Sequence, residues 1–393
     1  MKVLRPLPLP STPAVVDRLD DVRAILDGAS AYAPVPESDR AATDRAATQL
    51  ATALGVGEPI DEAFSLVIST SGSTGTPKGA QHSPSTLAAS ARSTALRLGG
   101  PGNWLLALAP HHIAGLQVLL RALAAGHTPA ALDLADGFDP ASYARAVADL
   151  DGPRRYTSLV PTQLVKVLDH AGATAASRGL DAILVGGAAT PKPLQDRALA
   201  EGLPIVATYG MSETAGGCVY DGTPLDGVEV RIVDPAPDGV GRVMLGGPVV
   251  AHGYRYRPDH PAFAEPGWFR TDDLGSVDDT GTLTIVGRAD EAISTGGLTV
   301  VPQVVEAVIV DDPAVAECAV VGLPDARLGE KVVAFVVVRP GEQLDVSRIR
   351  GSVTERLDRY AAPRDVVEVD ALPLRGPGKY DRRALRDRFG STT

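Results

Sequence analysis

The stretch Ser69–Gly79, with the sequence STSGSTGTPKG, constrains this chain more than any other segment. It places three glycines, six hydroxyl side chains and one lysine in eleven residues, directly after the mostly apolar run Phe64–Ile68. A strand that ends in such a loop brings together backbone N–H groups, hydroxyls and an ammonium, which together suit a polyphosphate. We therefore predict a phosphate-binding loop, whose contacting residues are Ser71, Gly72, Ser73, Thr74, Gly75 and Lys78.

The spacing in this loop excludes a P-loop nucleotide triphosphatase. That motif needs glycine directly before its lysine and serine or threonine after it, whereas here Pro77 precedes Lys78 and Gly79 follows. A solvated glycine- and serine-rich loop without a ligand is the alternative. The strand-like run before the loop and its Pro-Lys-Gly ending favour the functional interpretation.

Length, charge and cysteine content limit the class of protein. With 393 residues the chain can form two or three domains, each with its own core. A net charge of −11 argues against nucleic acid or an anionic membrane surface as the main partner. Cys218 and Cys318 lie far apart and fit neither a metal site nor a disulfide framework. No leader peptide and no membrane span is recognisable, so we expect a cytoplasmic protein.

Apolar runs and helical patterns alternate along most of the chain. Val16–Leu26 and Asp39–Leu54 have helical spacing and are joined by the turn-rich Gly28–Ser38. Strand-like and helical stretches then alternate from Trp104 to Thr208, which predicts an α/β core with a largely parallel sheet.

The hydrophobic pattern of the sequence changes twice more. From Gly227 short β-like runs predict a small β subdomain, and after Arg288 a fresh α/β pattern begins. We predict a large domain of layered sheets and helices over residues 1–289 and a small mobile α+β domain over residues 290–393.

The segment TYGMSET, Thr208 to Thr214, follows an apolar strand. Tyr209 beside Gly210 could lay its ring against a base, and Ser212 with Glu213 offers hard oxygen ligands for Mg²⁺ held between phosphates. Together with the phosphate loop, this motif resembles the adenylate-forming superfamily of acyl-CoA synthetases, luciferases and peptide-synthetase adenylation domains. In that resemblance Gly186, Gly187 and Ala188 form the turn that passes over the adenine.

Three downstream motifs extend the resemblance almost to the end of the chain. In WFRTDDLG, Asp273 maps to the carboxylate that holds the ribose hydroxyls. Asp272 stands where most members have glycine, which usually marks a positive φ or a close approach, and we expect the turn there to be preserved because aspartate tolerates positive φ better than most residues. In GRADEAISTGGLTVVP, Arg288 would meet the ribose or phosphate, Asp290 would be the hinge, and Gly296 with Gly297 would line the path of the CoA thiol. In PLRGPGKYDRRAL, Lys379 maps to the lysine of the adenylation step, where one ammonium can neutralise charge on the α-phosphate.

The segment PHHIAGLQVLLRAL, Pro110 to Leu123, contains the residues that bear on the acid substrate. By resemblance His112 gates the acyl pocket, and no third ligand accompanies His111 and His112 to make a metal site. Arg121 lies on an otherwise apolar helix, where it must snorkel to water, pair, or meet an anion such as a substrate carboxylate.

The resemblance narrows to the o-succinylbenzoate–CoA ligases of menaquinone biosynthesis. It implies that Arg121 serves the aromatic dicarboxylate and that Thr214, Gly216 and Gly217 border its ring. The implied catalytic residues are Lys379, Glu213 and His112, the implied cofactors are ATP and Mg²⁺, and CoA is a co-substrate.

Two other classes of function stay open at this point. One is another aryl- or acyl-CoA ligase, and the other is an adenylation module that loads a carrier protein. A nucleotide-binding protein without catalysis would not need Lys379, Glu213 and Asp273 together. The sequence leaves open whether the chain forms a homodimer.

Overall fold

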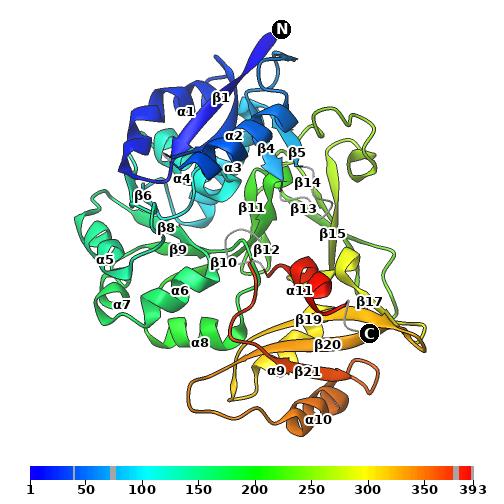
Figure 1. Cartoon of the computed structure of the whole chain (residues 1–393). Coiled ribbons are helices and arrows are strands. Elements are labelled where there is room, and N and C mark those ends of the chain that lie inside the picture. The colour runs from blue at the N-terminus through cyan, green and yellow to red at the C-terminus, as the bar shows by residue number, and fades with distance from the viewer. Residues whose placement is uncertain (39, 71–76, 375–379, 391–393) are drawn as a thin grey trace. The chain divides into compact units, whose positions relative to one another are not determined.

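The computed structural model describes residues 1–38, 40–70, 77–374 and 380–390 (Figure 1). The chain forms two compact units. Unit 1 comprises Met1–Thr190, Leu194–Arg231 and Met244–Arg270, and unit 2 comprises Pro191–Pro193, Ile232–Val243 and Thr271–Thr393. Strands β13 (Glu229–Val233), β14 (Gly241–Gly246) and β15 (Trp268–Val277) each cross this division in sequence. The domain boundary expected between residues 289 and 290 stays a prediction, as does the hinge at Asp290.

The first sheet of unit 1 has five strands in the order β3-β1-β2-β4-β5. Its strands are β1 (Lys2–Pro10), β2 (Ala31–Glu37), β3 (Pro59–Ile60), β4 (Leu66–Thr70) and β5 (Lys78–His82). The helical elements of the same part of the chain are η1 (Pro13–Arg18), α1 (Leu19–Leu26), α2 (Ala41–Leu54) and α3 (Pro84–Arg97). The two helices expected near the N-terminus are therefore confirmed.

The turn-rich interpretation of Gly28–Ser38 is wrong, because most of that segment is the buried strand β2. Tyr32 donates its N–H to Ser65 on the side of β4, and this is where β2 and β4 pair. Pro34 and Pro36 lie two and four residues further along, so their backbone nitrogens point to the same side of the strand as that of Tyr32. On this side β2 and β4 form only the one residue pair at Tyr32. Their missing N–H groups therefore remove no ladder hydrogen bond, and the prolines are tolerated within the strand.

The second sheet of unit 1 has seven strands in the order β12-β11-β10-β9-β8-β6-β7. They are β6 (Asn103–Leu106), β7 (Ala130–Ala131), β8 (Arg155–Leu159), β9 (Ala182–Val185), β10 (Ile205–Met211), β11 (Gly216–Tyr220) and β12 (Thr223–Pro224). From β7 to β10 all neighbours are parallel, whereas β10, β11 and β12 pair antiparallel. The expected α/β core with a largely parallel sheet is confirmed.

Helices α4 (Ile113–Ala124), α5 (Pro140–Asp149), α6 (Pro161–Leu168), α7 (Ala171–Ser177) and α8 (Lys192–Ala200) alternate with these strands. Figure 1 shows α5, α6 and α7 beside the sheet. Tyr143 and Val147 of α5 and Leu164 of α6 pack with Leu105 and Ile183 of the strands in one buried core. The short elements η2 (Ser212–Thr214) and η3 (Pro261–Phe263) complete unit 1.

Unit 2 contains a second α/β arrangement around the sheet β18-β17-β20-β19, with β21 beside β20. Its elements are β16 (Leu283–Arg288), η4 (Ala289–Glu291), β17 (Ile293–Thr295), β18 (Leu298–Val300), α9 (Pro302–Val310), β19 (Val315–Asp325), β20 (Gly329–Val338), α10 (Val346–Arg356), β21 (Asp365–Glu368) and α11 (Arg382–Phe389). Alternate residues of β19 and β20 enter two different cores. Val320 and Val336 pack with α9 and α10, whereas Val321 and Phe335 pack with Leu385 of α11, so helices cover both faces.

Within the described residues, no helix is long and apolar enough to cross a bilayer.

The N-terminal strand β1 should be integral to the stability of unit 1. Leu4 is fully buried in a core with Leu54, Ile60 and Val67, so Leu4→Ala should lower the free energy of unfolding by about 2–5 kcal/mol. Val3 is 52% exposed, so Val3→Ala should cost less than about 1 kcal/mol. Urea unfolding followed by circular dichroism checks both, and equal losses would contradict this packing.

Candidate active site

The predicted phosphate loop joins two antiparallel strands. Thr70 at the end of β4 pairs with Lys78 at the start of β5, and Ser69 pairs with Gly79. A Cβ on Gly79 would lie 2.6 Å from Val67 Cγ1, so close packing of the hairpin requires glycine there. The backbone of Lys78 is thereby fixed at the first residue of β5, where the loop ends. Ser71, Gly72, Ser73, Thr74 and Gly75 lie outside the described residues.

The TYGMSET motif contacts both strands of this hairpin. Ser212 Oγ donates to the carbonyl of Ser69 at 2.8 Å, across 143 residues of sequence. His82 Nε2 donates to the carbonyl of Ser212 at 2.7 Å. The structure therefore brings together the two motifs that the sequence assigned to phosphate and Mg²⁺, and they meet within unit 1.

Lys78 and Glu213 both contact one tyrosine. Lys78 Nζ lies 4.5 Å from the centroid of the Tyr254 ring, and the Tyr254 hydroxyl donates to Glu213 Oε1 at 2.5 Å. Tyr254 and Glu213 are both buried. Tyr254 was not predicted from the sequence, because its role follows from contacts with residues 41 and more positions away. Its position next to glycine in a proline-flanked segment was the only available signal.

The donor set fits an Mg²⁺ ion that binds chiefly through phosphates. Ser212 and Glu213 supply hard oxygen atoms at the end of β10, and Mg²⁺ normally takes one or two carboxylates together with substrate phosphates. Among the described residues no group of three or more His, Cys, Asp and Glu side chains could hold a metal ion by itself. The residues present would therefore complete, rather than form, the coordination of such an ion.

The predicted adenine-binding residues lie at the carboxyl ends of β9 and β10. A Cβ on Gly186 would lie 2.2 Å from Thr208 Oγ1, and a Cβ on Gly210 would lie 2.1 Å from the carbonyl oxygen of Gly216. Both positions therefore require glycine. Gly187 and Ala188 follow Gly186, and Tyr209 precedes Gly210 in β10. Carboxyl ends of parallel strands are where ligands bind in open α/β sheets.

Helix α4 packs against the segment predicted to border the acid. Gln117 Nε2 and Ser90 Oγ both donate to the carbonyl of Ala215, at 2.7 and 3.0 Å. Ala215 has a φ of 52° and Gly216 a φ of 92°, so the chain turns sharply here between Thr214 and Gly217. Gln117 was not predicted, since only this contact shows that it supports the turn.

Arg121 lies one turn beyond Gln117 on α4 and is 6% exposed. Its guanidinium carbon lies 5.4 Å from the centroid of the Trp104 ring, and its Nε has no hydrogen-bond partner. This burial leaves little of the side chain in contact with water. A buried guanidinium without a carboxylate partner among the described residues is costly unless an anion binds it.

His112 is the residue before α4 and is exposed, whereas His111 is more buried. The two rings lie 4.3 Å apart, centroid to centroid. Burial, with a smaller effect of the neighbouring His112, lowers the pKa of His111 to about 3, so His111 is neutral at physiological pH.

In unit 2 the predicted ribose and hinge residues form one charged group. Arg288 is opposite Asp273 in the β15–β16 pair, and its Nη1 lies 3.3 Å from Asp273 Oδ1. Its Nε and Nη2 donate to both carboxylate oxygens of Asp290 at 2.8 and 2.9 Å. These carboxylates raise the pKa of Arg288 although burial opposes them.

The turn expected at Asp272 is not present. Asp272 lies within strand β15, has no positive φ, and accepts a hydrogen bond from Arg242 at 2.8 Å. Glycine is therefore not needed at this position, and aspartate fits because its carboxylate has a cationic neighbour.

Gly296 and Gly297 form the two-residue turn between β17 and β18, with φ of 59° and 81°. Such a hairpin turn requires positive φ, so its geometry alone explains both glycines. Their role in the path of CoA stays a prediction. Lys379 lies outside the described residues, beside Tyr380, which bridges to Leu374.

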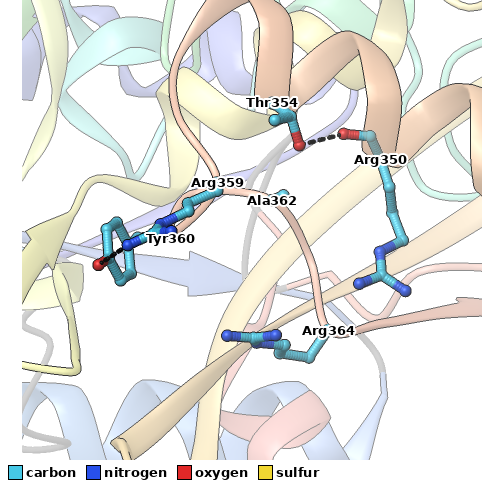
Figure 2. A pocket seen from close by; sticks show the side chains of 6 residues that line it. All are labelled: Arg350, Thr354, Arg359, Tyr360, Ala362 and Arg364. Atoms are coloured by element: carbon cyan, nitrogen blue, oxygen red, sulfur yellow. Dashed lines mark hydrogen bonds between the residues drawn. The ribbon is translucent and has the colours of Figure 1, made fainter.

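Unit 2 also carries a hollow of about 400 Å³ lined by Arg350, Thr354, Arg359, Tyr360, Ala362 and Arg364 (Figure 2). Arg359 donates to the hydroxyl of Tyr360 at 2.6 Å. The hollow is cationic and contains none of the residues predicted from the sequence.

Comparisons with known proteins agree with the motifs. A family model described as AMP-binding enzyme matches residues 8–255, and one described as AMP-binding enzyme C-terminal domain matches residues 304–379. A probable 2-succinylbenzoate–CoA ligase of Mycobacterium tuberculosis is 49% identical over 390 residues, 98% of each chain. A 2-succinylbenzoate–CoA ligase of Geobacillus kaustophilus is 32% identical, over 83% of this chain and 69% of its own.

One solved structure is the o-succinylbenzoate CoA synthetase of Bacillus subtilis in complex with its acyl-adenylate intermediate. It matches with a TM-score of 0.76 and 25% identity, and the match covers 98% of this chain and 88% of that one. The expected adenylate-forming fold is confirmed.

The contact between His82 and Ser212 should make stability depend on pH. Burial lowers the pKa of His82 to about 4, against a smaller opposing effect of its hydrogen bond to Ser212. The unfolded chain therefore takes up a proton below pH 6.5 that the folded chain does not, and stability is lost as the pH falls from 6.5 toward 4.

His82→Gln, which keeps an N–H donor, should remove about 2–3 kcal/mol of the stability loss between pH 7.5 and 4.5. His127→Gln, at a half-exposed position, is the control. Urea unfolding at the two pH values measures the difference, and an unchanged loss in His82→Gln would refute a neutral buried His82.

Proposed function

The chain belongs to the family of AMP-binding enzymes, and on that premise we propose that it is the ligase that joins o-succinylbenzoate to CoA in menaquinone biosynthesis. The reaction consumes ATP, passes through an acyl-adenylate, and yields 2-succinylbenzoyl-CoA, AMP and pyrophosphate. The names of its relatives, one of them matching almost the whole chain, support this acid and this thiol. We place the reaction in the cytoplasm.

In the first step a carboxylate oxygen of the acid attacks the α-phosphorus of ATP. A new O–P bond forms, the bond to the leaving pyrophosphate breaks, and the mixed anhydride stays bound. Residues Ser71–Gly75 and Lys78 hold the phosphates, and Tyr209 lies against the base. Mg²⁺ held by the phosphates and Glu213 would neutralise charge on the leaving group. Asp273 binds the ribose hydroxyls, and Lys379 stabilises the charge at the α-phosphate.

In the second step the CoA thiolate attacks the carbonyl carbon of the acyl-adenylate, and AMP leaves. The C-terminal domain turns about Asp290 between the steps, which withdraws Lys379 and presents Gly296 and Gly297 to the pantetheine arm. His112, the residue before α4, gates the acyl pocket.

The observation that carries the choice of acid is the buried guanidinium of Arg121. A second carboxylate on the substrate would give this cation the partner that the described residues do not supply. The planar guanidinium matches a carboxylate with two parallel hydrogen bonds. A monoacid would leave the cation buried and unpaired, which gives the pocket a reason to prefer a dicarboxylate.

We expect Arg121→Met, which keeps the length of the side chain but removes its charge, to raise the KM for o-succinylbenzoate about 10- to 100-fold. The KM for ATP should change less than about twofold, because the contact is to the acid. Arg97→Met on α3 is the control, since Arg97 is partly exposed and lies beside Asp221. Steady-state AMP release measures both constants, and equal increases of the two would refute a contact with the acid.

A further inference from the structure

We propose that Tyr254 is a positioning residue that holds Lys78 and Glu213 in register for Mg²⁺-bound triphosphate. The inference rests on the proposed function, which assigns phosphate to Lys78 and the metal to Glu213. Tyr254 itself is outside every motif that the sequence singled out. It contacts both residues through different parts of one side chain, the ring and the hydroxyl.

The Tyr254 side chain is held firmly enough to act as a support. It is 2% exposed, and its ring packs edge-on against His260 and Phe263, with centroids 4.8 and 5.0 Å away. Its backbone runs beside β5, where it bridges to Ala80, two residues after Lys78. The position of the ring relative to Lys78 is therefore fixed by the fold rather than by the ligand.

The ring offers Lys78 a weak and releasable contact. The ammonium lies 4.5 Å from the ring centroid, and no carboxylate among the described residues forms an ion pair with it. A cation over an aromatic face is attracted less strongly than a cation bonded directly to a carboxylate. Lys78 can therefore be held beside Tyr254 and still move onto phosphate without breaking a strong ion pair.

The hydroxyl of Tyr254 fixes Glu213. It donates a 2.5 Å hydrogen bond to Glu213 Oε1, and a bond to a charged acceptor in a buried site is strong and directional. Donation to a carboxylate also raises the electron density of the ring, which strengthens its attraction for the ammonium. The two contacts of Tyr254 therefore reinforce each other.

A nearby tyrosine provides a matched control. Tyr256 also donates to a glutamate, Glu58, at 2.7 Å, but it is 57% exposed and Glu58 has no place in the candidate site. Tyr254→Phe and Tyr256→Phe remove the same kind of hydrogen bond two residues apart. Tyr254→Leu removes the aromatic ring as well.

Calorimetric titration with ATP, in excess Mg²⁺ and in EDTA, separates the two contacts. Tyr254→Phe should weaken binding of Mg²⁺–ATP about tenfold and leave binding of ATP in EDTA within about twofold, because the variant loses the hydrogen bond to Glu213 and keeps the ring beside Lys78. Tyr254→Leu should weaken both. Tyr256→Phe should change neither. Thermal unfolding of each variant shows whether the fold is lost. Tyr254→Phe should disturb the fold less than Tyr254→Leu, because it keeps the ring.

Three results would overturn the proposal: equal behaviour of Tyr254→Phe and Tyr256→Phe, equal weakening by Tyr254→Phe with and without Mg²⁺, or no Mg²⁺–ATP binding by the wild type. The titration needs no acid and no CoA. If the pattern holds but no acid releases AMP, the proposed function fails while the role of Tyr254 stands.

Discussion

The candidate site depends on the hydrogen bonds that fasten η2 to the β4–β5 hairpin. Ser212 donates to the Ser69 carbonyl, and His82 donates to the Ser212 carbonyl. These contacts set where Glu213 lies relative to Lys78. They also require a neutral His82, because its Nδ1 is buried without a partner and a second proton there would place an unpaired charge in the interior. The geometry for phosphate and the stability of the fold thus depend on the same ring.

Motifs that act through their own local sequence could be predicted. The strand before the phosphate loop, the parallel strands β8, β9 and β10, and the position of Arg121 on a helix all follow from hydrophobic pattern and spacing. Such patterns do not indicate which side chains from distant parts of the sequence contact the site residues. Tyr254 and Gln117 support the site through long-range contacts, so no local signal distinguished them.

Errors of prediction arose where one residue type fits two environments. The segment that contains β2 suggested turns, but its Pro34 and Pro36 lie beyond the one residue pair that joins β2 to β4, so they remove no hydrogen bond on that side. Asp272 in place of glycine suggested a preserved turn, whereas the strand continues and Arg242 donates a hydrogen bond to the carboxylate. The pairing of Arg288 with Asp273 and Asp290 was not foreseen either, although all three residues were predicted for the site. A nucleotide that uses Asp273 and Arg288 must compete with this existing pair.

AMP release by the purified protein with Mg²⁺–ATP and CoA tests the proposed activity most directly. The comparison is between o-succinylbenzoate, benzoate, a fatty acid and no acid. Turnover should depend on o-succinylbenzoate, with AMP and the CoA thioester formed in equal amounts. AMP release with a monoacid instead would contradict the assigned acid, and release of AMP without thioester would favour transfer of the acyl group to a carrier protein.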